Sequence, residues 1–260
     1  MNIVSWDSFV TQPLPFEARS ATVGVFDGLH LGHRALIDRI LTFDATLSPS
    51  VFTFLENPKE ILRPKDFDGN IFSLDQKLDA FEKLGVALTV LIDFSGNFGK
   101  LSGKDFVDLL KDRGKLRYLA VGSDFRCGYR LDTDAERIRS LNEADGIPTD
   151  IVTPVLWGGM PVSSSRIRTA IAAGNLVEAT ALLGRSFVLD LGSASTTPDA
   201  ASVEYDVGST RRITPPNGRY PVIVKNDFSS LGTECEIEID RGRVRVPARI
   251  GVVKYVEFIR

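Results

Sequence analysis

The residues most able to do chemistry are two histidines in the stretch "GVFDGLHLGHRAL", residues 24–36. His30 and His33 are the only histidines among the 260 residues, and Gly28 and Gly32 lie beside them. Glycines let the backbone come close to a ligand, and imidazole N–H groups can donate hydrogen bonds to a phosphorus centre as negative charge develops on it. The pair therefore predicts a site for phosphate chemistry.

Two other interpretations of the histidine pair stay open. The rings could have a purely structural role at the surface or in the core, or they could bind a metal ion. Metal binding is disfavoured, because the chain has no further histidine and no nearby cysteine to complete a nitrogen or sulfur site. We therefore name no metal-ligating residue from the sequence, and the ligands of any metal ion stay open.

A second candidate motif is "VSSSRIR", residues 162–168. Ser163, Ser164 and Ser165 fall where a helix is expected to begin, and hydroxyl and N–H groups at a helix start can hold an anion. Arg166 and Arg168 add fixed positive charge. A plain serine cap beside two solvated arginines is the alternative. Together with the histidine pair, the motif suggests that a triphosphate is held from both ends during nucleotidyl transfer.

The elements that must position these motifs follow an alternating pattern. Short apolar runs alternate with longer amphipathic ones from about residue 20 to residue 185, which predicts an α/β, Rossmann-like parallel sheet. We expect strands at 21–26, 50–54, 87–92, 118–122 and 150–155, and helices from near Gly32 and over 73–85 and 102–113. Ser102, with Asp105 three places on, predicts the capped start of the helix at 102–113. Residues 162–185 are expected to form two short helices separated at Gly174. Open α/β sheets bind ligands at the carboxyl ends of their strands, where both motifs fall.

The hydrophobic pattern of the chain changes at Phe187, after which polar and apolar residues alternate. This period predicts a small all-β, barrel-like domain of about six strands. We therefore expect two domains, residues 1–186 and 187–260. Asp240, Arg241 and Gly242 predict a hairpin turn, and the polar, small-residue stretch 192–202 is expected to be a mobile loop.

Composition limits the classes of partner. The formal net charge of -3 argues against bulk attraction to nucleic acid or to an anionic membrane. The N-terminus lacks a basic region followed by an apolar run, and no stretch has the length of a membrane span. Cys127 and Cys235 are too few for a disulfide framework. We expect a cytoplasmic protein with free thiols and no nucleic-acid or membrane partner; its oligomeric state stays open.

Four blocks of the chain resemble one family in order and spacing. They are "TVGVFDGLHLGHRALI", "VFTFLENPKEILRP", "LAVGSDFRCGYRLDTD" and "VSSSRIRTAIAAGNLVEATALLGRSF". They resemble the N-terminal domain of the bacterial bifunctional riboflavin kinase/FAD synthetase family, over roughly residues 20–187. The HxGH and [IV]SSTxIR elements among them are similar to signatures of the nucleotidylyltransferase superfamily. The resemblance implies an FMN adenylyltransferase that converts FMN and ATP into FAD and pyrophosphate, with Mg²⁺ as the expected cofactor.

The resemblance also implies roles for individual residues. His30 and His33 would stabilise the pentacovalent transition state at the α-phosphorus of ATP. The β- and γ-phosphates would be held by Ser164, Ser165 and Arg168. The residues that it implies around the adenosine and the flavin are Gly24, Phe26, Asp27, Asn57, Pro58, Asp124, Phe125 and Arg126.

The chain departs from the family pattern at three of these blocks. Asn57 stands where the family usually has a histidine in an F-x-P-H-P block, Ser165 where threonine is commoner, and Cys127 where phenylalanine is frequent. Asparagine can donate and accept hydrogen bonds but cannot carry a proton at neutral pH. We therefore expect altered flavin binding rather than lost chemistry.

The C-terminal part departs further. In the family this domain is a riboflavin kinase whose first strands carry a glycine-rich stretch ending in Pro-Thr-Ala-Asn. This chain reads "LDLGSASTTPDAASVEYD" there, at residues 189–206. We expect a degenerate, kinase-like domain without kinase activity. The alternatives are a bifunctional enzyme, nucleotidyl transfer to another phosphate such as phosphopantetheine or a glycerol phosphate, and a non-catalytic flavin or nucleotide sensor.

Overall fold

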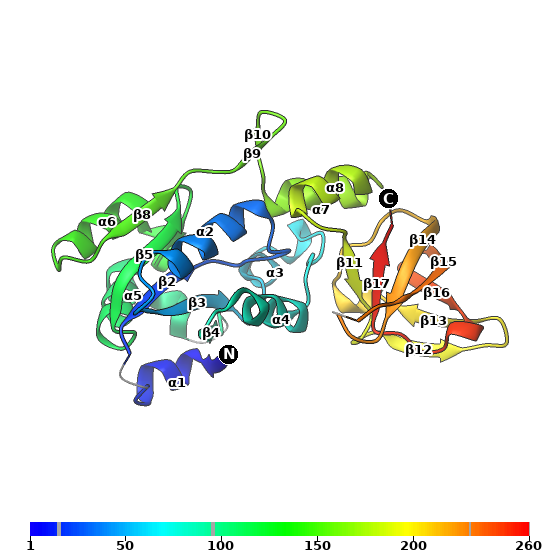
Figure 1. The fold of residues 1–260 in the computed structure, drawn as a ribbon, viewed down its shortest axis with the longest axis horizontal. Helices are drawn as coiled ribbons and strands as arrows, with labels where there is room; N and C mark the ends of the chain where they lie inside the picture. The colour runs from blue at the N-terminus through cyan, green and yellow to red at the C-terminus, as the bar shows by residue number, and fades with distance from the viewer. Residues whose placement is uncertain (15–16, 95–96, 229, 260) are drawn as a thin grey trace. The chain divides into compact units, whose positions relative to one another are not determined.

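The computed structural model describes residues 1–14, 17–94, 97–228 and 230–259. Within them, one sheet is parallel and six-stranded, in the order β1-β4-β3-β2-β5-β8 (Figure 1). Its strands are β1 (Asn2–Ser5), β2 (Arg19–Val23), β3 (Ser48–Phe54), β4 (Leu88–Ile92), β5 (Leu116–Gly122) and β8 (Thr149–Val152). The predicted α/β class with a parallel sheet is confirmed. The short edge strand β1 was not predicted.

The strand order identifies where this sheet can bind a ligand. From β2 the chain runs outward through β3 to β4, and then returns to β5 on the other side of β2. The order therefore reverses between β2 and β5, and open α/β sheets bind ligands at the carboxyl ends of the strands at such a point.

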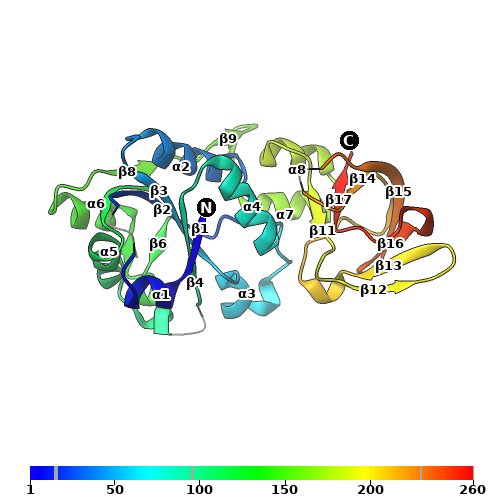
Figure 2. The ribbon, with the colours of Figure 1, turned by 60° about the horizontal axis from the view of Figure 1, so that its bottom comes forward.

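Helices cover the two faces of this sheet. Helices α1 (Trp6–Thr11), α5 (Gly103–Asp112) and α6 (Ala135–Glu143) contribute Phe9, Phe106 and Ile138 to one core cluster, with α5 and α6 side by side (Figure 2). Helix α2 (Leu31–Thr42) lies on the other face, where the Ser20 hydroxyl donates to the carbonyl of Ile40 at 2.6 Å.

Local signals set several of these boundaries. The predicted cap of α5 is confirmed, because the Ser102 hydroxyl accepts the Asp105 N–H at 3.1 Å. The remaining elements before α7 are α3 (Pro58–Leu62), α4 (Leu74–Leu84), β6 (Arg126–Cys127), β7 (Thr133–Asp134), β9 (Leu156–Trp157) and β10 (Met160–Pro161).

The C-terminal part contains two helices and a curled antiparallel sheet (Figure 1). Helices α7 (Ser164–Ala172) and α8 (Leu176–Leu183) are separated at Gly174, as predicted. In the described residues the sheet has seven strands, in the order β11-β17-β14-β15-β16-β13-β12. They are β11 (Val188–Asp190), β12 (Ser195–Pro198), β13 (Ser202–Asp206), β14 (Gly218–Lys225), β15 (Thr233–Asp240), β16 (Arg243–Pro247) and β17 (Tyr255–Phe258).

Alternating burial and one turn explain how this sheet forms. Val222 and Val224 of β14 are buried, with less buried residues between and beside them, so one face of the strand faces the core. The predicted hairpin is confirmed, because Arg241 and Gly242 connect β15 to β16 with φ values of +48° and +76°. Two consecutive positive φ angles are typical of the type I′ turns that match the twist of a hairpin.

The expectation of a loop over 192–202 was wrong. Strand β12 lies inside that stretch and pairs with β13. The Asp199 carboxylate closes the connecting turn by accepting the N–H groups of Ala201 and Ser202 at 2.6 and 2.7 Å. Every side chain of β12 is exposed, so the strand carries no apolar alternation that would reveal it in the sequence.

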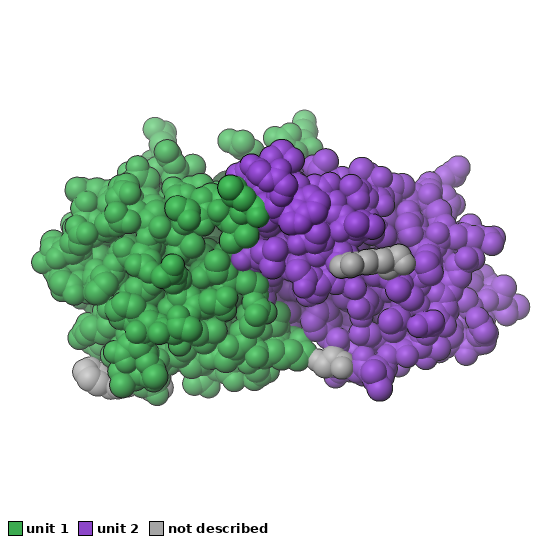
Figure 3. Space-filling model, turned by 45° about the horizontal axis from the view of Figure 1, so that its top comes forward, with its two compact units in different colours: residues 1–26, 32–66, 78–156 green, residues 27–31, 67–77, 157–260 purple. Residues whose placement is uncertain are grey.

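The described residues divide into two compact units, coloured separately in Figure 3. The first unit consists of residues 1–26, 32–66 and 78–156, and the second of residues 27–31, 67–77 and 157–260. The loop that carries His30 therefore belongs to the second unit, although β2 before it belongs to the first. The folding-domain boundary expected near residue 186 stays a prediction.

None of the helices in the described ranges has the length and the apolar content that are required to cross a membrane.

Replacing Leu119 with alanine should lower the free energy of unfolding by about 2–5 kcal/mol, because it removes buried methyl groups from β5 and leaves a cavity. Leu119 is 1% exposed, whereas Leu62 is 62% exposed and serves as the matched control. Leu62→Ala should change the stability by less than about 0.5 kcal/mol. Urea unfolding of both variants checks this, and equal losses would contradict the packing described.

Candidate functional site

The loop after β2 has a strained backbone. Phe26, Gly28 and Leu29 all have positive φ angles, of +52°, +78° and +41°. Left-handed backbone costs energy in residues other than glycine, and it persists where the surroundings hold it and often where function requires it. The loop leads directly into α2, so His30 immediately precedes the helix and His33 lies in its first turn.

The side chain of Asp27 anchors this loop within the second unit. Its Oδ1 accepts the N–H groups of Ile71 and Phe72, both at 2.9 Å. Its Oδ2 forms an ion pair with the Arg168 guanidinium, and the two side chains are only 4% and 7% exposed. A buried carboxylate needs such partners to offset the loss of hydration. The pair brings together the two motifs singled out in the sequence.

A second contact joins the same two motifs. The Ser164 hydroxyl donates to the main-chain carbonyl of Asp27 at 2.9 Å. Arg168 also donates through Nε to the carbonyl of Gly69 at 2.7 Å. Helix α7 is therefore joined to the histidine loop by a hydrogen bond to the main chain of Asp27 as well as by the ion pair with its side chain.

The charge state of His30 follows from its surroundings. The residue is 5% exposed, and burial together with the nearby Arg168 charge lowers the pKa of its imidazole to about 4. The ring is therefore neutral at physiological pH, with one N–H donor and one acceptor nitrogen. It can donate a hydrogen bond to an anion without carrying a charge itself.

His33 belongs to the first unit, where its side chain packs against an aromatic ring. Its imidazole meets the Phe26 ring edge-on, with the centroids 5.2 Å apart. Phe26 is fully buried and also contacts Phe81 edge-on. The Phe26 ring packs over Gly24, where an added Cβ would lie 3.1 Å from it. These contacts orient the His33 ring.

The other residues of the serine motif differ in their surroundings. Ser163 is the N-cap of α7 and accepts the Arg166 N–H at 3.2 Å, while Ser165 is exposed. The Arg166 guanidinium donates to Glu178 at 2.8 and 2.9 Å and to the carbonyl of Trp157 at 3.0 Å. Arg166 is therefore held by α8 and by the β9–β10 hairpin.

The candidate flavin residues follow β3 and β5, the two neighbours of β2 in the parallel sheet. Asn57 is the N-cap of α3 and accepts the Lys59 N–H at 3.1 Å, with Pro58 as the first helical residue. Asp124 and Arg126 are exposed in the segment after β5, and Phe125 is partly buried against the core. All of them lie at the carboxyl edge of the sheet.

Two cations, the buried Lys77 and the partly buried Arg185, were not predicted as part of the site. Burial lowers the pKa of Lys77 to about 8, although the Asp27 charge opposes the shift. Arg185 donates to the carbonyl of Gly28 at 2.7 Å and lies 4.3 Å above the Phe72 ring, and its burial lowers its pKa to about 10. The sequence signal for Lys77 was its place on the apolar face of a helix, four residues before Phe81.

In the described part of the chain, no three or more histidine, cysteine, aspartate or glutamate side chains gather into a group that could hold a metal ion. The Asp27 carboxylate, the acid nearest to the two motifs in the sequence, is bonded to two amides and a guanidinium.

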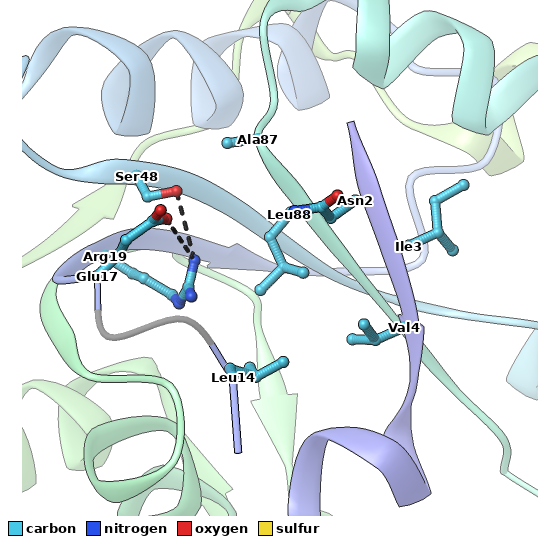
Figure 4. A pocket seen from close by; sticks show the side chains of 9 residues that line it. All are labelled: Asn2, Ile3, Val4, Leu14, Glu17, Arg19, Ser48, Ala87 and Leu88. Carbon is cyan, nitrogen blue, oxygen red and sulfur yellow. Dashed lines mark hydrogen bonds and ion pairs between the residues drawn. The ribbon is translucent and has the colours of Figure 1, made fainter. Parts of the chain in front are cut away.

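The first unit also contains a pocket of about 300 Å³ at the opposite edge of the parallel sheet. Its lining includes the first residues of four strands, Asn2, Arg19, Ser48 and Leu88. Figure 4 shows the Arg19 guanidinium bonded to Ser48 and Glu17 there. The pocket contains none of the predicted site residues and lies at the amino ends of the strands, so we do not assign it to the phosphate chemistry.

Comparison with known proteins identifies similar chains. Residues 15–166 match the family model described as FAD synthetase. The bifunctional riboflavin kinase/FMN adenylyltransferase of Escherichia coli K12 is 29% identical over 221 residues, which are 81% of this chain and 69% of that protein. The proteins of the same name from Pseudomonas fluorescens and Bacillus subtilis are 32% and 30% identical, each over 64% of this chain and 54% of theirs.

A solved structure supports the fold. The crystal structure of a macrolide-efflux protein from Streptococcus pneumoniae matches with a TM-score of 0.81 and covers 99% of this chain and 90% of that one. Its sequence identity is 22%, so the likeness concerns the fold alone.

The low pKa of His30 predicts a pH dependence of stability. The unfolded imidazole takes up a proton near pH 6.5 but the folded one only near pH 4, so the unfolded state binds more protons between these values. Relative to a His30→Gln variant, the native protein should lose up to about 1.4 kcal/mol per pH unit as the pH falls through this window. Above pH 7 the difference should be constant. Urea unfolding of both proteins between pH 4.5 and 8 measures it, and a pH-independent difference would contradict the assignment.

Proposed function

Because this chain belongs to the FAD synthetase family, whose members are nucleotidyltransferases, we propose that it transfers AMP from ATP to FMN and does not phosphorylate riboflavin. The products are FAD and pyrophosphate. The observation that carries the proposal is the buried Asp27–Arg168 ion pair, which holds the histidine loop and the serine helix together in one compact unit.

The chemistry is a direct displacement at phosphorus. A phosphate oxygen of FMN attacks the α-phosphorus of ATP, the new oxygen–phosphorus bond forms, and the bond to the β-phosphate oxygen breaks. No covalent bond to the protein is required. Such reactions are accelerated mainly by positioning and by electrostatic stabilisation of the charge that develops on the phosphoryl oxygens.

His30 and His33 are the proposed donors to the α-phosphate. His30 is neutral and buried, so its N–H can donate a hydrogen bond that strengthens as charge develops. His33 is oriented by Phe26 and lies in the first turn of α2, where the helix dipole adds positive potential. The two rings act on the transition state more than on bound ATP.

The start of α7 is proposed to hold the leaving group. Ser164 and Ser165 lie in its first turn, where N–H groups and hydroxyls favour the oxygens of the β- and γ-phosphates. Arg168 is fixed by Asp27 and contributes its charge from a constant position. Ser163 and Arg166 support this turn through the cap and the contact to Glu178.

The substrates' organic parts are assigned to the carboxyl edge of the parallel sheet. Gly24, Phe26 and Asp27 would shape the adenosine side. Asn57 and Pro58, after β3, together with Asp124, Phe125 and Arg126, after β5, would contact the flavin. Asn57 caps α3, so its effect on flavin binding would act partly through the placement of that short helix.

Mg²⁺ is proposed to enter with the triphosphate. The described residues offer no group of three protein ligands, so phosphate oxygens and water would supply most of the coordination. The ion would neutralise charge on the departing pyrophosphate.

Two features support the absence of kinase activity. The stretch 189–206 has neither the paired glycines nor the Pro-Thr-Ala-Asn end that the kinase family uses. It forms the β12–β13 hairpin, with every β12 side chain exposed.

We also propose that the protein acts in the cytoplasm, because both of its cysteines are free thiols and ATP is its substrate.

A chromatographic assay with ATP and Mg²⁺ tests the function. FAD should appear from FMN, and neither FMN nor FAD should appear from riboflavin. FMN formed from riboflavin would show that the kinase activity is retained. Binding of FMN and ATP without any product would instead identify a non-catalytic sensor and would overturn the proposal.

Alanine variants of the two histidines test the mechanism. His30→Ala and His33→Ala should each lower kcat about 100- to 1000-fold, the cost of removing one donor to a developing oxyanion. The Kd for ATP should change far less, because the lost contact acts mainly on the transition state. His33→Gln keeps an N–H donor and should recover part of the rate. Either alanine variant retaining the full rate would refute the assigned role.

A further inference from the structure

Two segments of the second unit that are far apart in the sequence are bonded as in a sheet. The Asn70 N–H donates to the carbonyl of Arg211 at 2.8 Å, and the Ile213 N–H donates to the carbonyl of Asn70 at 3.1 Å. Asn70 and Arg212 thus form an isolated parallel bridge. Residues 211–213 connect β13 to β14, so the antiparallel sheet presents them.

The two backbones approach so closely that only glycine fits at position 69. Gly69 has a φ of +108°, and a Cβ there would lie 2.7 Å from the nitrogen of Ile213 and 2.8 Å from the carbonyl carbon of Arg212. The carbonyl of the same glycine accepts the Arg168 Nε–H. Gly69 therefore touches both the 211–213 segment and a candidate phosphate ligand.

Ile71 and Phe72 extend this connection to the loop that carries Asp27 and His30. The Ile71 and Phe72 N–H groups donate to Asp27, while the Phe72 carbonyl accepts from Arg212 Nη1 at 3.3 Å. Residues 69–72 thus bond to residues 211–213 through the main chain of Asn70 and the Phe72 carbonyl. They bond to Asp27 and Arg168 through the Ile71 and Phe72 amides and the Gly69 carbonyl. Movement of residues 211–213 would move the amides that hold Asp27.

We propose that residues 211–213 form a positioning element for adenylyl transfer, with Arg212 as its positioning residue. They fix residues 69–72, and residues 69–72 fix the Asp27 carboxylate and Arg168 on which the loop of His30 depends. This inference rests on the proposed function. It gives the antiparallel sheet a role in the transferase reaction that is independent of any kinase activity.

The strained loop explains why such an element is needed. Phe26 and Leu29 have left-handed backbone conformations, which in residues other than glycine persist only where surrounding contacts over-determine them. Asp27 lies among these residues, so the direction of its side chain governs the path of the chain toward His30. Two amides supplied by a well-held segment are a stronger restraint than two amides in a loop without long-range contacts.

Arg212 variants test the element by kinetics. Arg212→Gln should lower kcat for FAD formation about tenfold while changing the KM for ATP less than threefold, because the site is displaced but its phosphate ligands remain. Arg212→Lys can still donate to the Phe72 carbonyl and should restore most of the rate. Arg212 is only partly buried, so both variants should fold, and their thermal midpoints are measured alongside.

A glycine pair provides a matched control. Gly69→Ala introduces both a strained φ and a steric clash, whereas Gly251→Ala introduces a similar strain at φ +78° with open space around the new Cβ. Gly69→Ala should reduce kcat at least tenfold, and Gly251→Ala should leave it within twofold. Equal kinetics for the two variants would overturn the proposal.

Amide hydrogen exchange separates this inference from the proposed function. In Arg212→Gln, the Ile71 and Phe72 amides should exchange at least tenfold faster than in the native protein, whereas core strand amides should be unchanged. Unchanged exchange at residues 71 and 72 would overturn the positioning role even if FAD is formed. A native protein that forms no FAD, but shows the faster exchange in the variant, would refute the function and leave the positioning element in place.

Discussion

The ion pair between Asp27 and Arg168 is the contact on which the arrangement of the site depends. Both side chains are almost fully buried, so each would be costly to bury alone. The cost is offset by two amide donors to the carboxylate and by a carbonyl acceptor for the guanidinium. Breaking a pair of this kind leaves an uncompensated charge, worth about 3–5 kcal/mol. Because the pair and its hydrogen-bond partners come from three distant segments, this set of contacts specifies how those segments meet.

The charges around the same pair determine the protonation state of His30. Arg168 and Lys77 are buried cations of the second unit and Arg185 is a partly buried one, and the Arg168 charge together with burial keeps the His30 imidazole neutral. A neutral imidazole is a poor general acid at physiological pH but a good fixed dipole. In the proposed transfer, His30 would therefore act by hydrogen bonding rather than by proton transfer.

Local patterns predicted the parts of the fold that local interactions determine. The buried strands of the parallel sheet, the Ser102 cap, the break between α7 and α8 and the Arg241–Gly242 turn could all be derived from the sequence. Strand β1 is mostly exposed and only four residues long, and β12 has no apolar alternation, so neither carries a signal of its own. Pairing with distant strands produces both.

The same distinction applies to the candidate site. The histidine loop and the serine helix could be identified because their residue types and glycines indicate phosphate chemistry. The roles of Lys77, Arg185 and Gly69 could not, because each depends on an interaction with a residue far away in the sequence or on a close backbone approach. Asn57 illustrates the converse, since a residue considered for flavin binding also proves to be a helix cap.

The interleaving of the two units has a consequence for how the protein is made. The chain passes from one unit to the other at residues 26–27, 31–32, 66–67, 77–78 and 156–157, so neither unit is a continuous piece of sequence. During synthesis, the parallel sheet up to β8 can form while the partners of residues 67–77 in the antiparallel sheet are still untranslated. The loop that carries His30 therefore lacks part of its stabilising contacts at that stage. Its strained conformation becomes stable only when the last third of the polypeptide has folded. Assembly of the candidate site is therefore a late, long-range event, and nascent chains that stop early carry both motifs without the contacts that residues 211–213 make with residues 69–72.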